Sequence, residues 1–265
     1  MAGSMVYRLP AGDIAAPHMA AFREALRQSE GIFDNRGYNY IAGFHGAPGW
    51  YCWHHQYNPR TPLQARLFLP WHRAYLSSLE LSLQDFVAGV SLPWWDWTTN
   101  RGVPSAYAPA SIGGQANPLH STRAWVPTAQ PPIDQRTWRA PGSNPWARLP
   151  TAGEIAALLG DSDYASFHDR MENYHDEVHN WVGGTMRDVT IAAFDPLFFA
   201  HHCMIDRIWY LWQVRYGNGG VPRDLLDLPL IPFGKRTREV LDVQRLGYEY
   251  AANSTEVPLV GGGNA

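Results

Sequence analysis

Two sets of histidines in this 265-residue chain have the spacing of metal ligands. His175 and His179 lie four residues apart, and on a helix this spacing puts both rings on one face. His202, one apolar segment further along, can supply a third nitrogen to the same ion. Imidazole suits copper, zinc, iron and nickel, so the spacing predicts a three-histidine site without choosing its metal.

A second set of three comes from the first third of the chain. His45 follows a short aromatic segment, His54 follows Cys52 and Trp53, and His72 lies in the run Leu-Pro-Trp-His-Arg. Two three-histidine sites therefore fit within one chain.

The elements that must position these side chains are predicted to be helices, because apolar residues recur at helical spacing wherever the pattern is clear. Thr151 and Glu154 form a capping-box pattern, and Gly183 and Gly184 end the segment that carries His175. The expected helices span 14–27, 38–45, 70–87, 155–159, from a cap at Asp161 or Ser162 to 181, and 196–216. Residues 99–150, dense in Pro, Gly and Ser, predict a long irregular loop. The expected fold is mainly α, a four-helix bundle with metals in its core.

The composition is globular, with 45% hydrophobic and 17% charged residues and a net charge of −3. No run of Lys and Arg occurs, which argues against nucleic acid or an anionic membrane surface as a partner. No apolar stretch reaches the roughly 20 residues of a membrane helix, and the N-terminus lacks a secretory signal. Cys52 and Cys203 do not make a disulfide framework, so we expect a cytoplasmic protein.

Four motifs, in order along the chain, carry a resemblance to a known family. They are Leu-Phe-Leu-Pro-Trp-His-Arg-Ala-Tyr-Leu at 67–76, Leu-Pro-Trp-Trp-Asp-Trp-Thr at 92–98, His-Asp-Glu-Val-His-Asn-Trp-Val-Gly-Gly at 175–184, and Asp-Pro-Leu-Phe-Phe-Ala-His-His at 195–202. Over residues 8–250 the sequence resembles the tyrosinase, catechol oxidase and haemocyanin family, in a bacterial form. The resemblance implies a type-3 dicopper site, in which two copper ions with three histidines each bind dioxygen together.

The resemblance also implies a domain organisation. Residues 6–252 are expected to form the catalytic domain, residues 1–5 to be a cloning scar that leaves room for a removed leader, and residues 253–265 to be a tail. Because little sequence follows Tyr250, we expect no covering domain over the site and activity without proteolysis. A separate copper-delivery chaperone is a possible partner.

For the second copper ion, copper B, the implied ligands are His175, His179 and His202. Neighbours on a helix point about 100° apart, so His201 and His202 cannot both face one ion. The family pattern places the second histidine of this pair on copper. His201 is therefore expected beside the site, where it supports a ligand or faces the substrate.

For the first copper ion, copper A, the implied ligands are His45, His54 and His72. The middle ligand of the family usually lies about nine residues before the Trp-His-Arg histidine, where this chain has Leu63, which cannot bind metal. His54 and His55 are the upstream candidates. Many family members have a Cys-X-His element whose sulfur is bonded to the ligand ring. Cys52-Trp-His54 fits it, so we expect a Cys52–His54 thioether, with a buried free thiol as the alternative.

On the substrate side, tyrosinases hold a water between a Glu before the first copper B histidine and an Asn after it. Glu172 is the counterpart of the Glu, but Asp176 stands where the Asn is usual. A phenol has a pKa near 10 and needs a base to bind copper as phenolate, so both are expected to be catalytic. The Asp176 carboxylate is either a better base than an Asn-held water or a charge that perturbs the copper. Asn180 and Val189 match positions that influence the balance of activities and entry to the pocket.

The expected function is oxidation of o-diphenols to o-quinones by dioxygen, together with ortho-hydroxylation of monophenols. The substrate would be a small phenol or catechol. Competing interpretations are a catechol oxidase or o-aminophenol oxidase without monophenolase activity, and a haemocyanin-like oxygen carrier. A zinc hydrolase also competes, with Glu177 as base in a loose match to HExxH.

Other polar residues have structural expectations. Asp206, one turn after His202, is expected to accept a hydrogen bond from a ligand ring or to pair with Arg207. The Tyr248-Glu-Tyr250 run is expected to be a packing device. His18, His120 and His168 match no ligand position and are expected at the surface.

Overall fold

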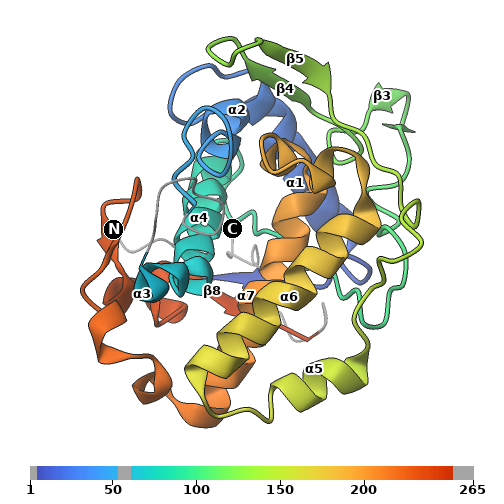
Figure 1. Ribbon diagram of the computed structural model, residues 1–265. Helices are drawn as coiled ribbons and strands as arrows, with labels where there is room; N and C mark the ends of the chain where they lie inside the picture. Colours follow the sequence, from blue (N-terminus) through green and yellow to red (C-terminus); the bar gives the residue numbers. More distant parts are fainter. Residues whose placement is uncertain (1–4, 53–60, 253–265) are drawn as a thin grey trace, which may run out of the picture.

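Four helices form the bundle at the centre of the computed structural model, which describes residues 5–52 and 61–252 (Figure 1). Helix α4 (Phe68–Gln84) packs against α7 (Leu197–Tyr216), while α6 (Tyr164–Val182) packs on α7 and α2 (Tyr38–Ala42) packs on α4. Helix α1 (Ala16–Glu30) covers α2 and α4. The predicted mainly α fold with a four-helix bundle is confirmed.

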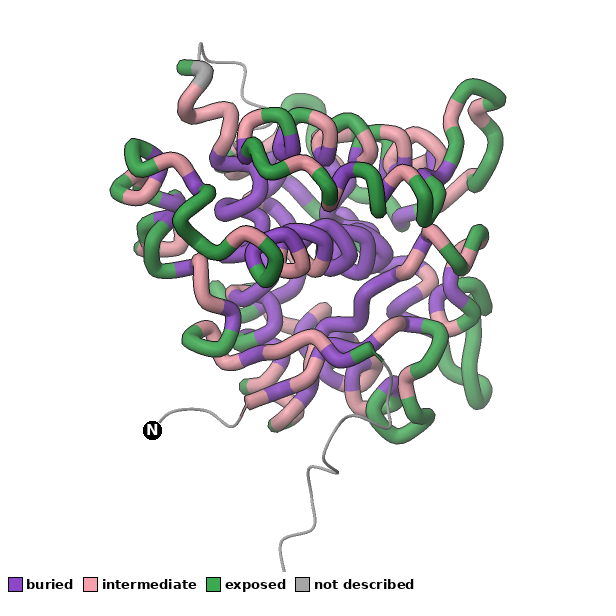
Figure 2. Tube along the Cα trace, turned by 90° about the horizontal axis from the view of Figure 1, so that it is seen from below, coloured by how far each residue is buried: buried purple, intermediate pink, exposed green. Residues whose placement is uncertain are grey.

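The inner helices of the bundle are more buried than the segments around them. Helices α4 and α7 are buried along most of their length and lie in the interior, where they carry both apolar and polar side chains. The outer segments alternate exposed and half-buried residues around this core (Figure 2). Five tryptophan side chains are completely buried, at positions 71, 95, 97, 209 and 212, and contribute much of the core.

Several helix ends differ from those expected from the sequence. Helix α2 ends at Ala42, because the next amides, of Phe44 and His45, donate to carbonyls three residues back instead of four. His45 therefore lies in the turn beyond the helix. The cap of α6 is Asp163, whose carboxylate accepts from Ser166 N at 2.8 Å, and not Asp161 or Ser162. Helix α4 starts two residues before Pro70.

The stretch 99–150 is not simply irregular, because it contains two antiparallel hairpins. Strand β2 (Ser111–Ile112) pairs with β3 (Gln115–Ala116), and β4 (Arg123–Val126) pairs with β5 (Ile133–Arg136). A third hairpin joins β6 (Pro229–Leu230) to β7 (Lys235–Arg236). These strands are too short to show the alternation that predicts a strand from sequence.

The two ends of the described chain meet in a parallel pair. Strand β1 (Val6–Arg8) runs alongside β8 (Tyr248–Tyr250), with Arg8 opposite Tyr250. The sequence did not predict this pairing, because nothing local links residues so far apart. It brings Arg8 and the two tyrosines to the same side of α7.

The remaining elements are short. Helices α3 (Pro62–Ala65) and α5 (Ala152–Leu158) both begin with complete capping boxes, at Thr61 and Thr151. Six 3₁₀ turns complete the described elements: Gly184–Arg187, Ala192–Phe194, Asn218–Gly220, Arg223–Leu225, Thr237–Val240 and Gln244–Leu246.

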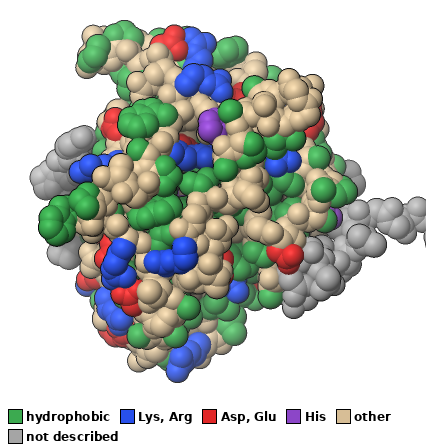
Figure 3. Space-filling view, turned by 90° about the vertical axis from the view of Figure 1, so that its right-hand side faces the viewer, with side chains coloured by type: hydrophobic (Ala, Val, Ile, Leu, Met, Phe, Trp, Pro, Cys, Tyr) green, Lys and Arg blue, Asp and Glu red, His purple; other side chains and the backbone are tan. Residues whose placement is uncertain are grey.

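The surface carries both signs of charge. On the side of the molecule shown in Figure 3, acidic and basic side chains lie scattered among apolar ones, without a large area of one sign. Within the described ranges, every helix is too short or too polar to cross a bilayer.

Candidate metal centre

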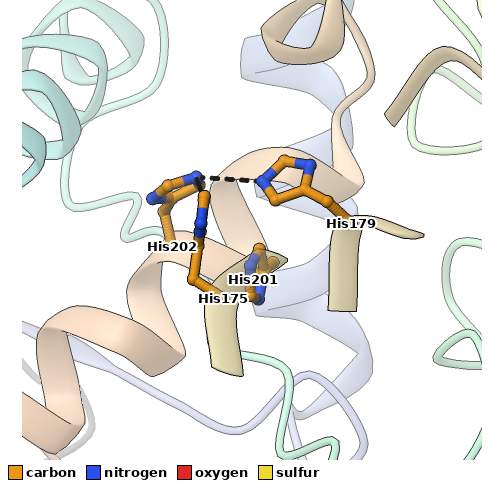
Figure 4. A group of neighbouring side chains, drawn as sticks. All are labelled: His175, His179, His201 and His202. Carbon is orange, nitrogen blue, oxygen red and sulfur yellow. Dashed lines mark hydrogen bonds between the residues drawn. The ribbon is translucent and has the colours of Figure 1, made fainter. Parts of the chain in front are cut away.

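Three imidazole nitrogens converge between α6 and α7 (Figure 4). The Nε2 atom of His202 lies 3.1 Å from Nε2 of His175 and 3.4 Å from Nε2 of His179. Bonds of about 2.0–2.1 Å from a tetrahedral metal to two imidazoles would place their nitrogens about 3.3–3.4 Å apart. The three rings therefore have the spacing of ligands around one ion.

The opposite nitrogens of two of these rings are fixed by acceptors. Nδ1 of His179 lies 2.6 Å from the Met186 carbonyl oxygen, and Nδ1 of His175 lies 2.9 Å from a carboxylate oxygen of Asp176. An Nδ1–H that donates to these oxygens leaves the Nε2 lone pair free to point at a metal, which is the usual way in which proteins orient ligand histidines.

A second group lies directly across the bundle. His72, on α4, has Nδ1 2.9 Å from the Phe68 carbonyl oxygen, and its ring stacks on His202 with centroids 4.1 Å apart and planes 13° apart. His45 lies beside it, with ring centroids 5.6 Å apart. Helix α4 and the turn after α2 thus bring His45 and His72 against the first group.

The third expected ligand of this second group, His54, lies outside the described residues, as does His55. Its neighbour Cys52 is buried, and the Cys52 sulfur lies 3.8 Å from Nε2 of His72. Ligand atoms of His45, Cys52 and His72 all lie within 4.8 Å of one another. The Cys52–His54 thioether stays a prediction.

The turn that carries His45 depends on close backbone packing at Gly46. A Cβ added to Gly46 would lie 2.3 Å from the Thr190 carbonyl oxygen, far inside contact distance. The same oxygen accepts a hydrogen bond from Ala47 N at 2.9 Å. Gly46 therefore lets the turn lie flat against residues 189–190, which fixes His45 at the centre although it is outside a helix.

The end of α6 has a similar requirement. Gly183 and Gly184 have φ values of 65° and 55°, in the region that favours glycine. They reverse the chain so that Met186, in the following 3₁₀ turn, presents its carbonyl oxygen to His179. The two glycines thus end the helix and orient one of its ligands.

The electrostatics of the centre favour neutral imidazole. Burial lowers the pKa of His202 well below its ordinary value, and the neighbouring rings of His72 and His175 lower it further. The pKa of His201 is lowered in the same direction, mainly by burial. Metals bind the neutral ring, so these histidines need no deprotonation at neutral pH before binding.

The residues therefore fit a metal centre built from imidazole. Because Nδ1 of His175 and Nδ1 of His179 already face acceptors, the Nε2 lone pairs of both rings point at Nε2 of His202, where one ring N–H could donate well to only one of them. A bound cation suits all three nitrogens. An all-imidazole donor set suits copper, and the mutual contact of the two groups suits a pair of ions.

A cavity of about 110 Å³ opens from the centre to the surface. Its buried floor consists of His45, His175, Met186 and Ala192. His179, Asn180 and Val189 line it half-buried, and Asp176 and Arg187 lie exposed at its rim. Sequence reasoning missed Met186, Arg187 and Ala192, because a carbonyl oxygen and a rim position leave no motif.

Two other expected site residues lie outside the cavity lining. His201 is completely buried and stacks on His175 with planes 16° apart, which favours the supporting role over the substrate-facing one. Glu172 also lies outside the cavity wall, with its carboxylate 3.8 Å from Nδ1 of His168. Its water-holding role stays a prediction.

Two further residues of α6, Glu177 and His168, also lie outside the cavity wall. Glu177, the base that a zinc hydrolase would need, has a carboxylate oxygen 3.6 Å from Arg148. His168 is buried, which contradicts its expected place at the surface. It precedes His175 by two helical turns on the same face of α6 and therefore points into the core.

Asp206 belongs to a buried ionic cluster and does not pair with Arg207. Its carboxylate accepts from Arg73 at 2.5 Å and Arg8 at 3.2 Å, and from the hydroxyls of Tyr248 at 2.7 Å and Tyr250 at 2.6 Å. Arg207 instead stacks over the Trp94 ring, 4.1 Å from its centroid.

Comparison with known proteins gives the family. Residues 35–151 and 125–215 match the common central domain of tyrosinase. The tyrosinase of Streptomyces lincolnensis is 34% identical over 202 residues, which cover 64% of this chain and 72% of that protein. The chain belongs to the tyrosinase family. It is a type-3 copper catalytic domain of this family, in the enzyme class of the copper polyphenol oxidases.

Haemocyanins are also similar to this tyrosinase-family chain. Unit G of the Helix pomatia haemocyanin β-C chain is 29% identical over 259 residues, which cover 86% of this chain but 61% of that protein. Among solved structures, the Burkholderia thailandensis tyrosinase superimposes with a TM-score of 0.76 at 20% identity, over 96% of this chain and 75% of that one. A functional unit of octopus haemocyanin gives 0.74 at 24% identity, over 92% and 68%. These two structures establish the shared fold.

Proposed function

We propose that this chain is an oxidase that uses dioxygen to convert o-diphenols to o-quinones and to hydroxylate monophenols at the ortho position. The observation that carries the proposal is the convergence of three Nε2 atoms, at 3.1 and 3.4 Å, at the end of a cavity open to solvent. An oxidase needs such access for its organic substrate.

In this proposal His175, His179 and His202 hold copper B, and His45 and His72 hold copper A together with His54. The pair of copper ions, when bound, supplies the electron transfers by which dioxygen is taken up and reduced. One dioxygen accepts four electrons and four protons from two o-diphenols, giving two o-quinones and two waters. The protein supplies the geometry, the access and the transfer of protons.

Asp176 is the group that the proposal assigns to proton handling. Its carboxylate lines the cavity and accepts from His175, and its backbone carbonyl accepts from Asn180 Nδ2 at 2.9 Å. A phenol ordinarily loses its proton near pH 10, so a carboxylate at the cavity can accept that proton as the oxygen approaches copper. Glu172 is assigned a supporting role through water.

Val189 and Asn180 shape the same path. Val189 lies half-buried between the rim and the floor, so a ring that approaches the histidines must pass it. Asn180 is fixed by its bond to the helix backbone and presents a polar edge to the same space. We assign entry control to Val189 and orientation of the ring to Asn180.

The test is oxygen uptake by copper-loaded protein supplied with a simple monophenol, and in parallel with catechol. Uptake with both substrates supports the full proposal, and uptake with catechol alone reduces it to a catechol oxidase. An o-aminophenol as a third substrate separates the o-aminophenol oxidase variant.

A second candidate, reversible oxygen carriage, is suggested by the similarity to haemocyanins. Reversible oxygen binding without consumption of catechol would favour it.

A further inference from the structure

The rim of the copper cavity carries one side chain of each charge. Asp176 and Arg187 are the exposed members of the lining, and they belong to different segments, helix α6 and the 3₁₀ turn Gly184–Arg187. The rest of the lining is histidine, asparagine or apolar. A ring that enters the cavity therefore meets both an anion and a cation at the rim.

The two charges differ in what they already bind. Asp176 accepts a hydrogen bond from His175, so its carboxylate is committed to the centre. Across residues 5–52 and 61–252, no ion pair or side-chain hydrogen bond engages the Arg187 guanidinium. A guanidinium carries five N–H donors in a planar fork that matches a carboxylate.

The backbone under Arg187 is nevertheless held firmly. The preceding residue, Met186, is buried and accepts from His179 at 2.6 Å, and the next amide, of Asp188, closes the turn on Thr185 at 3.1 Å. The Cα of Arg187 is thus fixed relative to a copper ligand, while its side chain is free to reorient toward a ligand at the rim.

We propose that Arg187 is a specificity-determining residue of this centre, which binds a carboxylate on a chain opposite the reacting hydroxyl and so favours acidic over neutral phenols and catechols. The inference rests on the proposed function and assigns that preference to one residue. With the hydroxyl end at the histidines, the tail emerges at the rim. Arg187 attracts a carboxylate there, which favours entry with the hydroxyl end of the ring toward the histidines.

Other charges nearby do not remove this preference. Asp188 follows Arg187 in sequence, but its carboxylate accepts from Thr190 N at 2.9 Å and lines a neighbouring hollow instead of the copper cavity. The anionic tail therefore has one cation, Arg187, in the lining of the cavity that it leaves.

The experiment compares two catechols on copper-loaded protein, one neutral and one with a propanoate chain para to a hydroxyl. The quantity measured is the ratio of KM for the acid to KM for catechol. Arg187→Gln is expected to raise this ratio about three- to tenfold, the size of a partly solvated charge-assisted contact. Arg187→Lys should recover part of the change, and added salt should shrink the wild-type preference.

Arg223→Gln is the matched control. Arg223 is also exposed and outside the copper cavity, and its loss removes the same net charge. This variant should leave the ratio unchanged. A shift as large as that of Arg187→Gln would mean that net charge acts at a distance, and the proposal would be overturned. An unchanged ratio in Arg187→Gln would overturn it as well.

Binding of 3-phenylpropanoate, which has no hydroxyl to oxidise, separates this inference from the proposed function. Calorimetry on copper-loaded protein should show weaker binding to Arg187→Gln than to wild type by the same three- to tenfold. If catechol were not oxidised at all, the proposed function would fail, while this measurement would still decide whether Arg187 binds a carboxylate. Equal binding to both proteins would exclude the subsite.

Discussion

Two buried polar clusters lie one turn apart on α7, and they are built in opposite ways. Around Asp206, four donors from three other elements converge on one carboxylate, and the cluster is closed. Around His202, three imidazole nitrogens face one another without a proton donor that suits them all. With Glu80, which accepts from Arg8 at 3.0 Å, the first cluster pairs two arginines with two carboxylates. The second cluster is complete only when something binds to it.

The difference separates stability from function. Arg73 follows His72 on α4, and Asp206 follows His202 by four residues on α7, so the Arg73–Asp206 ion pair joins the two helices right beside the two histidine groups. The closed cluster, around Asp206, fixes the spacing of the two helices. The open cluster, around His202, depends on that spacing for the positions of its histidines. The changes below test whether the two roles can be separated.

Removing His202 should have the largest effect on function and should leave the ionic cluster intact. His202→Ala is expected to bind one copper ion instead of two and to lose oxygen uptake, because two of three ligands hold a metal poorly. Metal analysis of the folded protein measures this. His201→Ala is the matched control, being the neighbouring buried histidine, and should keep both ions. If the two variants exchanged their results, His201 would be the ligand.

Removing Asp206 should have the largest effect on stability. Asp206→Ala leaves Arg73 buried without a counterion, while Arg8 keeps its ion pair with Glu80 at 3.0 Å. Breaking a buried pair in this way costs about 3–5 kcal/mol. Urea unfolding of the metal-free protein measures the loss. Asp134→Ala, which breaks an exposed pair with Arg123, is the control and should change little.

Asp206→Asn keeps the shape of the side chain and one acceptor oxygen. This variant replaces Asp206→Ala in the experiment if the alanine variant does not fold. Its folded fraction should still bind two copper ions. If this variant lost copper but kept its stability, Asp206 would act in metal binding, and the assignment of stability to its cluster and metal binding to the other would be wrong.

Acid should affect the two clusters in separate pH ranges. Folding lowers the pKa of the buried His201 and His202, so the unfolded chain binds their protons first. Stability of the metal-free protein should therefore be full above about pH 6.5 and fall below it, by up to about 1.4 kcal/mol per pH unit for each ring. Replacing His201 and His202 together by Phe should make the stability of the metal-free protein less dependent on pH in this range.

The Asp206 cluster should resist acid down to a lower pH. Burial alone would raise the pKa of Asp206, but Arg73, Arg8 and the two tyrosine hydroxyls outweigh it and hold the pKa below its usual value. Its contribution should therefore persist until the pH falls below about 4, where the unfolded carboxylate takes up its proton. A single loss of stability at one pH for both clusters would contradict this separation.

The open cluster was largely predictable from the sequence, and the closed one was not. Helical spacing brought His175 and His179 to one face, and motif resemblance added His72 and His202. Asp206 was noticed, but its partners Arg8, Tyr248 and Tyr250 come from the parallel pair of chain ends, which no local pattern encodes. Long-range pairing of short strands depends on tertiary packing that spacing rules do not contain.

Within the copper cavity the same limit applies. Asp176, Asn180 and Val189 could be selected because they lie at fixed offsets from the histidines on or just after α6. His45 was expected inside a helix but lies in a turn held by Gly46, and Met186 acts through its carbonyl oxygen, which any residue type could supply. Backbone groups and turn geometry leave little trace in side-chain patterns.

A smaller change to the closed cluster tests how closely its parts cooperate. Tyr248→Phe removes one hydroxyl that donates to Asp206 at 2.7 Å but keeps the ring on which Arg8 stacks. The expected loss is about 2 kcal/mol, typical of a hydrogen bond to a charged group. Chemical unfolding measures it, and copper content should stay at two ions. Tyr210→Phe, on a half-exposed tyrosine nearby, is the control.

The smallest expected effect lies where the open cluster meets its substrate. Asp176→Asn keeps an oxygen that can accept from Nδ1 of His175, so the ring and its copper should stay in place, but it removes the negative charge from the cavity. Because catechol gives up its protons more readily than a monophenol, the ratio of monophenol to catechol turnover should fall about three- to tenfold, a change of at most about 1.4 kcal/mol in relative barrier. Oxygen uptake with the two substrates gives the ratio directly. An unchanged ratio with full copper would assign Asp176 to orienting His175 alone, and the open cluster would then handle protons without a carboxylate at its rim.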